Sequence, residues 1–173
     1  LYGRSSEIIK VRPMKAGWLK TFLNTDAVSA VEEYGIWGGV PRYWEIRKQA
    51  ASLQEAVKYS VLDRDGVLFV EPERLFIDDM RTSVQSFSIL SLIGSGCHRL
   101  SEIATRLGKP ATQLSRPLQN LIDLEYVIRE VPFNENYNNS KKSLYKISDP
   151  FLNFYFAFIV PNRSRLEYGL TNQ

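Results

Sequence analysis

This sequence of 173 residues contains one histidine, His98, and one cysteine, Cys97. A lone cysteine cannot form a disulfide within the chain, which excludes a disulfide-stapled scaffold. Two neighbouring residues of ligand type are also too few for a metal site. The sequence has no GxxxxGK[ST] loop, no HExxH and no paired CxxC. We therefore expect neither catalytic residues nor metal ligands in this chain.

Long apolar runs are missing as well. The longest, FLNFYFAFIV at residues 151–160, is far shorter than the roughly 20 residues that a membrane-spanning helix needs. We expect no membrane segment. No secretory signal is visible, so a reducing cytoplasm is the expected location. The sequence begins at Leu1 and not at Met, and we interpret it as a piece of a longer protein.

Charge of one sign is only slightly in excess, because the net charge is +3. Residues 1–81 hold 12 basic and 12 acidic residues, whereas residues 82–148 hold 8 and 5. The basic excess therefore lies in the middle segment. That segment is the electrostatic candidate for binding nucleic acid.

Residues 1–81 are predicted to form a small helical bundle. Asp26 is a predicted cap for a helix over residues 27–37, and Pro41 suits the first turn of the next helix. Ser52 and Glu55 have the spacing of a capping box, and Pro72 marks a further helix start. The residues expected to face the core from the first two helices are Trp18, Phe22, Leu23, Ala27, Val31 and Tyr34.

The pattern changes at residue 82. An amphipathic helix is followed by a short helix with Ser101 as its N-cap and Gly108 as its C-cap. A third helix and two β-prone runs, VIREVPF and SLYKIS, complete residues 82–148. This order is typical of a winged helix-turn-helix. The predicted fold class is mainly α with a small β-hairpin.

The third helix of such a domain enters the major groove of DNA while the wing contacts the backbone. Pro117 inside this helix removes one backbone hydrogen bond and predicts a kink or a late start. An exposed polar face would look the same in a winged helix that docks on proteins. The candidate DNA-binding residues are Lys109, Thr112, Gln113, Ser115, Arg116, Asn120, Lys141 and Lys142.

Residues 149–173 form the third predicted segment. Asp149 and Pro150 are suited to cap and start a helix. Its aromatic residues recur at helical spacing and predict a packing surface, against the winged helix or against a missing part. If the stripe were exposed, it could form a homodimer. These aromatic residues are Phe151, Phe154, Tyr155 and Phe158.

Four blocks of the sequence together resemble a known family. They are LYGRSSEIIKVRPM, GGVPRYW, LSEIATRLG with LQNLIDLEYVIREVPF, and YKISDPFLNFYFAFIVPNRSRLEYG. In this order they resemble the archaeal-type ATPases of the AAA+/STAND group of P-loop NTPases. The resemblance implies a helical lid over residues 1–81, a winged helix over 82–148, and the start of a C-terminal region. The Walker motifs of the family are absent, so we expect no ATP hydrolysis by this chain alone.

The resemblance also implies a nucleotide-sensing role for Gly39, Val40 and Pro41, which match the GxP motif of STAND-type lids. Arg4 stands where these ATPases keep an arginine near the end of the core. ATP or ADP with Mg would bind to the missing N-terminal core, and we expect no cofactor for this chain alone. Without the resemblance, a glycine stop followed by a proline start is the favoured explanation of GGVP. Three hypotheses follow: a regulatory part of an ATPase, a DNA-binding module, or a protein-docking domain.

Overall fold

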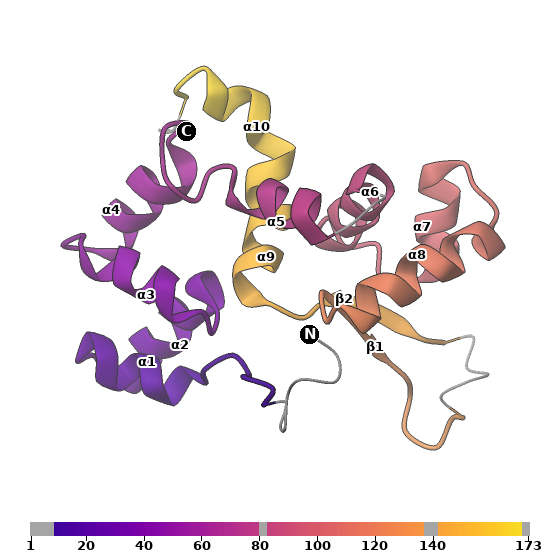
Figure 1. Ribbon diagram of the computed structural model, residues 1–173, viewed down its shortest axis with the longest axis horizontal. Helices are drawn as coiled ribbons and strands as arrows, with labels where there is room; N and C mark the ends of the chain where they lie inside the picture. The colour runs from indigo at the N-terminus through magenta and orange to yellow at the C-terminus, as the bar shows by residue number, and fades with distance from the viewer. Residues whose placement is uncertain (1–8, 80–82, 137–141, 171–173) are drawn as a thin grey trace, which may run out of the picture.

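The computed structural model describes residues 9–79, 83–136 and 142–170. In these residues the protein is mainly helical with one two-stranded antiparallel sheet, as the sequence predicted (Figure 1). The first half contains α1 (Ala16–Leu23), α2 (Ala27–Trp37), α3 (Pro41–Lys48), α4 (Leu53–Val57), the π-helix η1 (Lys58–Leu62) and α5 (Glu71–Asp79). The second half contains α6 (Ser83–Gly94), α7 (Leu100–Leu107), α8 (Ala111–Asp123), β1 (Val127–Glu130), β2 (Leu144–Ile147), α9 (Pro150–Phe154), the π-helix η2 (Tyr155–Ile159) and α10 (Val160–Glu167).

The helix starts in the first half were predicted well because capping depends on local chemistry. The Asp26 carboxylate accepts hydrogen bonds from the N–H groups of Val28, at 2.8 Å, and Ser29, at 3.1 Å. Pro41 is the first residue of α3. Ser52 caps α4 by accepting the Glu55 N–H at 3.1 Å. These contacts confirm the predicted starts of α2, α3 and α4.

The predicted core faces of α1 and α2 are only partly confirmed, because Phe22, Leu23 and Tyr34 are half-buried against the core. Leu19 of α1 is fully buried, whereas Trp18 is 62% exposed, and in α2 Val31 is 65% exposed. Residues Ala30, Glu33 and Trp37 form the buried stripe of α2 instead. Glu33 was not among the residues predicted to face the core. The buried stripe of α2 therefore leaves Ala27 and Val31 exposed, while Tyr34 is half-buried.

Glu33 is buried because it has partners on α2 and α3. Its carboxylate accepts the indole N–H of Trp37 at 2.8 Å and forms an ion pair with Arg47, with Nη2 and Oε1 2.7 Å apart. The Arg47 guanidinium also donates to the Ala50 carbonyl at 3.1 Å. A buried charge is tolerated only when it is paired and hydrogen-bonded in this way. This network fixes α3 against α2.

The second half contains α6, α7 and α8 followed by the hairpin. The N-cap of α7 is Arg99 and not Ser101 as predicted, because the Glu102 carboxylate accepts the Arg99 N–H at 3.1 Å and starts the helix earlier. Gly108 ends α7 with φ +61°, as predicted. Pro117 lies inside α8 without ending it. In the hairpin, Val127 pairs with Ile147 and Arg129 with Tyr145.

The C-terminal helices stand between the two groups of helices (Figure 1). Asp149 caps α9 by accepting the Leu152 N–H at 3.0 Å, as predicted. Helix α9 contacts α2 and β2, and η2 contacts α6. Gly94 permits this last approach, because a Cβ at residue 94 would lie 2.6 Å from the Cβ of Phe156. Buried residues of all three predicted segments thus join one hydrophobic core.

Candidate functional site

The turn between α2 and α3 contains the glycines and proline that the sequence singled out. Gly38 ends α2 with φ +62°, a backbone conformation that favours glycine. Its carbonyl accepts the indole N–H of Trp44 at 2.8 Å, which ties the turn to α3. Gly39 is buried, Val40 is half-buried and Pro41 is exposed at the start of α3. Of the three predicted sensing residues, only Pro41 is therefore fully accessible.

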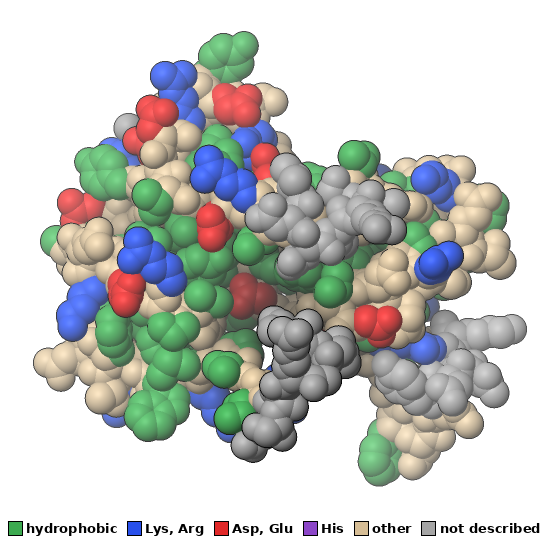
Figure 2. All heavy atoms as spheres, viewed as in Figure 1, with side chains coloured by type: hydrophobic (Ala, Val, Ile, Leu, Met, Phe, Trp, Pro, Cys, Tyr) green, Lys and Arg blue, Asp and Glu red, His purple; other side chains and the backbone are tan. Residues whose placement is uncertain are grey.

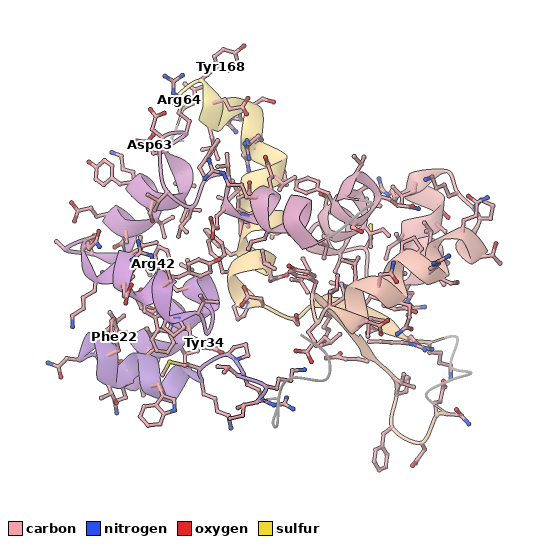
Figure 3. The ribbon with its side chains drawn as sticks, in the orientation of Figure 1. Phe22, Tyr34, Arg42, Asp63, Arg64 and Tyr168 are labelled. Atoms are coloured by element: carbon pink, nitrogen blue, oxygen red, sulfur yellow. The ribbon has the colours of Figure 1, made fainter. Side chains whose placement is uncertain are left out.

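Residues 9–15, which we call the N-terminal segment, cover Gly39. A Cβ at residue 39 would lie 2.4 Å from the Met14 carbonyl oxygen and 2.7 Å from the Cβ of Pro13. The Met14 N–H donates to the Gly39 carbonyl at 2.9 Å, and the Tyr34 hydroxyl donates to the Met14 carbonyl at 2.8 Å. Figure 3 places Tyr34 at the end of α2 that faces this segment. Close approach explains Gly39 without a ligand.

The N-terminal segment has a second contact, on the other half of the molecule. Lys10 forms an ion pair and hydrogen bond with Glu125, in the turn between α8 and β1. Lys10 lowers the pKa of the Glu125 carboxyl, and Arg12 adds to this effect. The same short segment therefore touches the α2–α3 turn and the α8–β1 turn. Arg4, the remaining predicted sensing residue, lies outside the described residues.

Asp149 forms a third link to the same turn. A Cβ at Gly38 would lie 2.9 Å from the Asp149 Oδ2, so the carboxylate of the α9 cap rests against the end of α2. Burial raises the pKa of Asp149, although the N–H groups of Leu152 and Phe151 partly oppose this shift. Burial also raises the pKa of Tyr43, with smaller contributions from Glu71 and Asp149. The sequence predicted Asp149 as a cap but gave no sign of its contact with Gly38.

The predicted DNA-binding side chains lie around α8. Leu114, Leu118 and Leu121 bury one side of this helix in the core. The opposite side is exposed and polar, and the Asp123 carboxylate there accepts a hydrogen bond from Gln119 at 2.8 Å. The predicted residues on and before α8, all of them exposed, are Lys109, Thr112, Gln113, Ser115, Arg116 and Asn120. The structure therefore brings six of the eight candidates to one helix and its preceding turn.

The hairpin adds less positive charge than the sequence suggested. Lys142 is paired with Glu135 at 2.8 Å and Lys146 with Glu130 at 2.6 Å. Lys141 lies outside the described residues. In α7, α8 and the turn between them, the exposed cations Arg106, Lys109 and Arg116 form no ion pair with a described residue. On the face drawn in Figure 2, Lys and Arg side chains are dispersed and do not form one patch.

The aromatic stripe is not the exposed surface that a homodimer would need. Phe151 and Tyr155 are fully buried, Phe154 is half-buried and only Phe158 is exposed, at 59%. The Tyr155 hydroxyl donates to the Phe69 carbonyl at 2.8 Å. Helix α9 contacts α2 and η2 contacts α6, so Phe151 and Tyr155 face inward while Phe158 does not. Phe151 and Tyr155 are excluded from the proposed dimer surface.

Neither metal chemistry nor a membrane span emerges from the part of the chain that the structure describes. No group of three or more His, Cys, Asp or Glu residues there could hold a metal ion. Among the same residues, no helix has both the length and the apolar character needed to cross a bilayer. The His98 Nδ1 lies 3.0 Å from the Tyr145 carbonyl oxygen. The backbone carbonyl of His98 accepts the Tyr145 N–H at 2.8 Å.

Comparison with known proteins relates this chain to a longer archaeal protein. The chain is 34% identical over 172 residues to an uncharacterized protein of Methanocaldococcus jannaschii. The alignment covers 98% of this chain but only 38% of that relative, so the chain spans well under half the relative's length. No family model matches the chain, and no solved structure matches it. In the relative, the matching region is thus part of a longer protein.

Proposed function

We propose that this chain is the regulatory part of an archaeal-type P-loop ATPase. In this proposal residues 1–81 form the helical lid of the ATPase, and the lid changes position when ATP or ADP binds. That movement then shifts the second half of the chain. The observation that carries the proposal is the N-terminal segment, which contacts both the α2–α3 turn and the α8–β1 turn. The greater length of the archaeal relative is consistent with a separate nucleotide-binding core.

The chemistry of the turn favours Pro41 as the residue that contacts the nucleotide. The open side of Gly39 is filled by Pro13 and Met14, so a base could not pack there. Pro41 is exposed and offers a stiff apolar surface at the first turn of α3. Because the chain has no Walker motif, ATP or ADP with Mg would be held by the rest of the protein. The chain itself would supply only this apolar contact.

Two contacts would transmit a movement of the turn. Gly38 lies against the Asp149 carboxylate at the start of α9, and α9 contacts β2. Met14 is bonded to Gly39, while Lys10 in the same segment is paired with Glu125. Both contacts reach the open end of the hairpin, where the start of β1 pairs with the end of β2, so a shift of the turn would displace that end. A two-state switch requires contacts that differ between the ATP-bound and ADP-bound states, and these contacts would have to differ in that way.

The test is a matched pair of proline substitutions in the full-length protein. Pro41→Ala removes the proposed nucleotide contact, and Pro132→Ala makes the same change at an exposed residue in the hairpin loop. The proposal predicts altered nucleotide affinity or turnover for Pro41→Ala alone. Unchanged values for Pro41→Ala, or equal changes in both variants, would contradict it.

A second candidate function is binding of duplex DNA by α6–β2, which we propose to be a winged helix-turn-helix. The order of α6, α7, α8 and the antiparallel hairpin supports this assignment. So does the pairing of the His98 carbonyl with the Tyr145 N–H, which adds a short extended segment beside β2. The exposed polar face of α8 would then enter the major groove. Arg116 would contact a phosphate or a guanine edge.

Duplex binding is tested by a salt series with matched arginine variants. The log of the affinity should fall steeply and linearly with the log of the salt concentration. Arg116→Ala should weaken binding, whereas Arg42→Ala should not, because Arg42 is exposed on α3 at the opposite side of the molecule from α8 (Figures 1 and 3). Absence of binding at low salt, or equal effects of the two substitutions, would contradict this function.

A protein-docking role is the third hypothesis, and burial restricts it. A homodimer through the aromatic stripe would have to use Phe158 with part of Phe154, whose ring centroids are 5.4 Å apart. The proposal places the protein in the cytoplasm, where a single free cysteine such as Cys97 is stable. If Phe158→Ser leaves the sedimentation coefficient unchanged over a wide concentration range, the dimer hypothesis fails.

A further inference from the structure

A groove of about 550 Å³ runs between α8 and the β-hairpin. The first turn of α7 closes one end, because Arg99, Leu100 and Ser101 line the groove together with α8. Its volume lies within the range of sites for small molecules, roughly 300–1,000 Å³. The residues that line it from α8 are Ala111, Ser115, Leu118, Gln119 and Ile122, and those from the hairpin are Arg129, Ser143 and Tyr145.

Two charged residues line the groove, and both are arginines, Arg99 and Arg129. Among the described residues that line the groove, none is acidic. Arg129 is half-buried and donates from Nε to the Ser143 hydroxyl at 2.8 Å, which fixes its position beside the hairpin. The side chain of Arg99 is 64% exposed, and its acidic partner Glu102 is 4.0 Å away and outside the lining. At that distance the ion pair is weak, so the Arg99 guanidinium can bind an anion that approaches more closely.

The polar groups around the arginines suit a phosphate. Guanidinium groups bind phosphate oxygens through paired N–H donors, and serine hydroxyls can donate as well. Ser101, Ser115 and Ser143 all line the groove, and Ser101 belongs to the first turn of α7, where backbone N–H groups favour an anion. The apolar residues Leu100 and Ile122 offer a surface for a sugar or base. Cationic, hydroxyl and apolar groups therefore occur together.

We infer that this groove binds the phosphate of a nucleotide, either within a nucleic acid strand or as a free molecule. The inference deepens the proposed duplex binding, because a strand contacted by α8 would pass between this helix and the hairpin. It does not require duplex binding, since a free nucleoside diphosphate such as ADP carries the same phosphate groups. Arg99 and Arg129 are the phosphate-binding residues, and Ser115 borders the phosphate on α8.

The experiment measures the affinity of the chain for two probes, a labelled 20-base-pair DNA duplex and ADP. Arg99→Gln removes an exposed guanidinium, and Ser115→Asp places a negative charge inside the groove without changing its arginines. Arg42→Gln on α3 is the matched control, and circular dichroism melts check that each variant is folded. We expect Arg99→Gln and Ser115→Asp each to weaken binding about tenfold at low salt. Arg99→Gln should also reduce the salt slope for the duplex by about 1.

The outcomes separate the groove from the proposed DNA function. If Arg116→Ala weakens duplex binding while Arg99→Gln and Ser115→Asp change neither probe, duplex binding holds and the phosphate groove is refuted. If the duplex does not bind but ADP does, with affinity lost in both groove variants, the groove takes a free nucleotide and the DNA function fails. Arg99→Lys retains a charge, so it should restore part of the affinity. Failure of both probes to bind wild-type protein refutes the groove.

Discussion

Replacing Gly39 by alanine tests the contact between the N-terminal segment and the α2–α3 turn. The added Cβ would lie 2.4 Å from the Met14 carbonyl oxygen and 2.9 Å from the Met14 nitrogen. Both are backbone atoms, so the clash cannot be relieved by rotating a side chain. The N-terminal segment must move away from the turn. The Met14–Gly39 and Tyr34–Met14 hydrogen bonds would then be lost.

The expected cost follows from those two hydrogen bonds. At roughly 0.5–1.5 kcal/mol each, their loss lowers the free energy of unfolding by about 1–3 kcal/mol. Gly35→Ala is the matched control, because nothing lies within 4 Å of a Cβ there. Since Gly35 is in α2, alanine should raise the free energy of unfolding by roughly 0.5–1 kcal/mol.

Urea unfolding followed by circular dichroism measures both changes. Limited trypsin digestion adds a local test, because release of the N-terminal segment makes the peptide bonds after Lys10 and Lys15 more accessible. Cleavage there should be faster in Gly39→Ala than in Gly35→Ala or wild type. A Gly39→Ala protein with wild-type stability and wild-type cleavage would refute the proposed packing of this segment.

Three further substitutions test the core. Arg47→Ala leaves the buried Glu33 carboxylate without its cation and should cost about 3–5 kcal/mol in urea unfolding, and Glu33→Gln with Arg47→Met should recover most of that loss. Asp149→Asn keeps the cap of α9 but removes a carboxyl whose pKa is raised by burial. Wild type should therefore lose stability relative to this variant as the pH rises from 3.8 through the raised pKa; equal pH profiles would contradict this. Gly94→Ala should destabilise by about 1–3 kcal/mol through its clash with η2, whereas Gly17→Ala, with no atom within 4 Å, should not.

Local chemistry explains what the sequence predicted correctly. Asp26, Ser52 and Asp149 each accept N–H groups of their own helix, and Gly108 ends α7 with a positive φ. These interactions span a few residues, so their spacing is visible in the sequence. The two β-prone runs also paired as expected, because alternating residues and a polar loop are typical of a hairpin.

Long-range contacts explain what was missed. The buried stripe of α2 depends on the pairing of Glu33 with Arg47, 14 residues further along, and hydrophobic spacing carries no trace of it. Likewise, the glycines of the α2–α3 turn drew attention as a nucleotide motif, but the atoms next to Gly39 belong to Pro13 and Met14. The groove residue Arg129 was not selected either, since its position depends on the pairing of β1 with β2.

The most direct test of the central claim is the affinity of the full-length protein for duplex DNA, measured at fixed salt with ATP and then with ADP. The account predicts two different affinities, because under the proposed function the nucleotide state would alter α8 through the N-terminal segment and α9. It further predicts that Pro41→Ala removes this difference while Pro132→Ala preserves it. Equal affinities with ATP and ADP, or a difference that survives Pro41→Ala, would contradict the account.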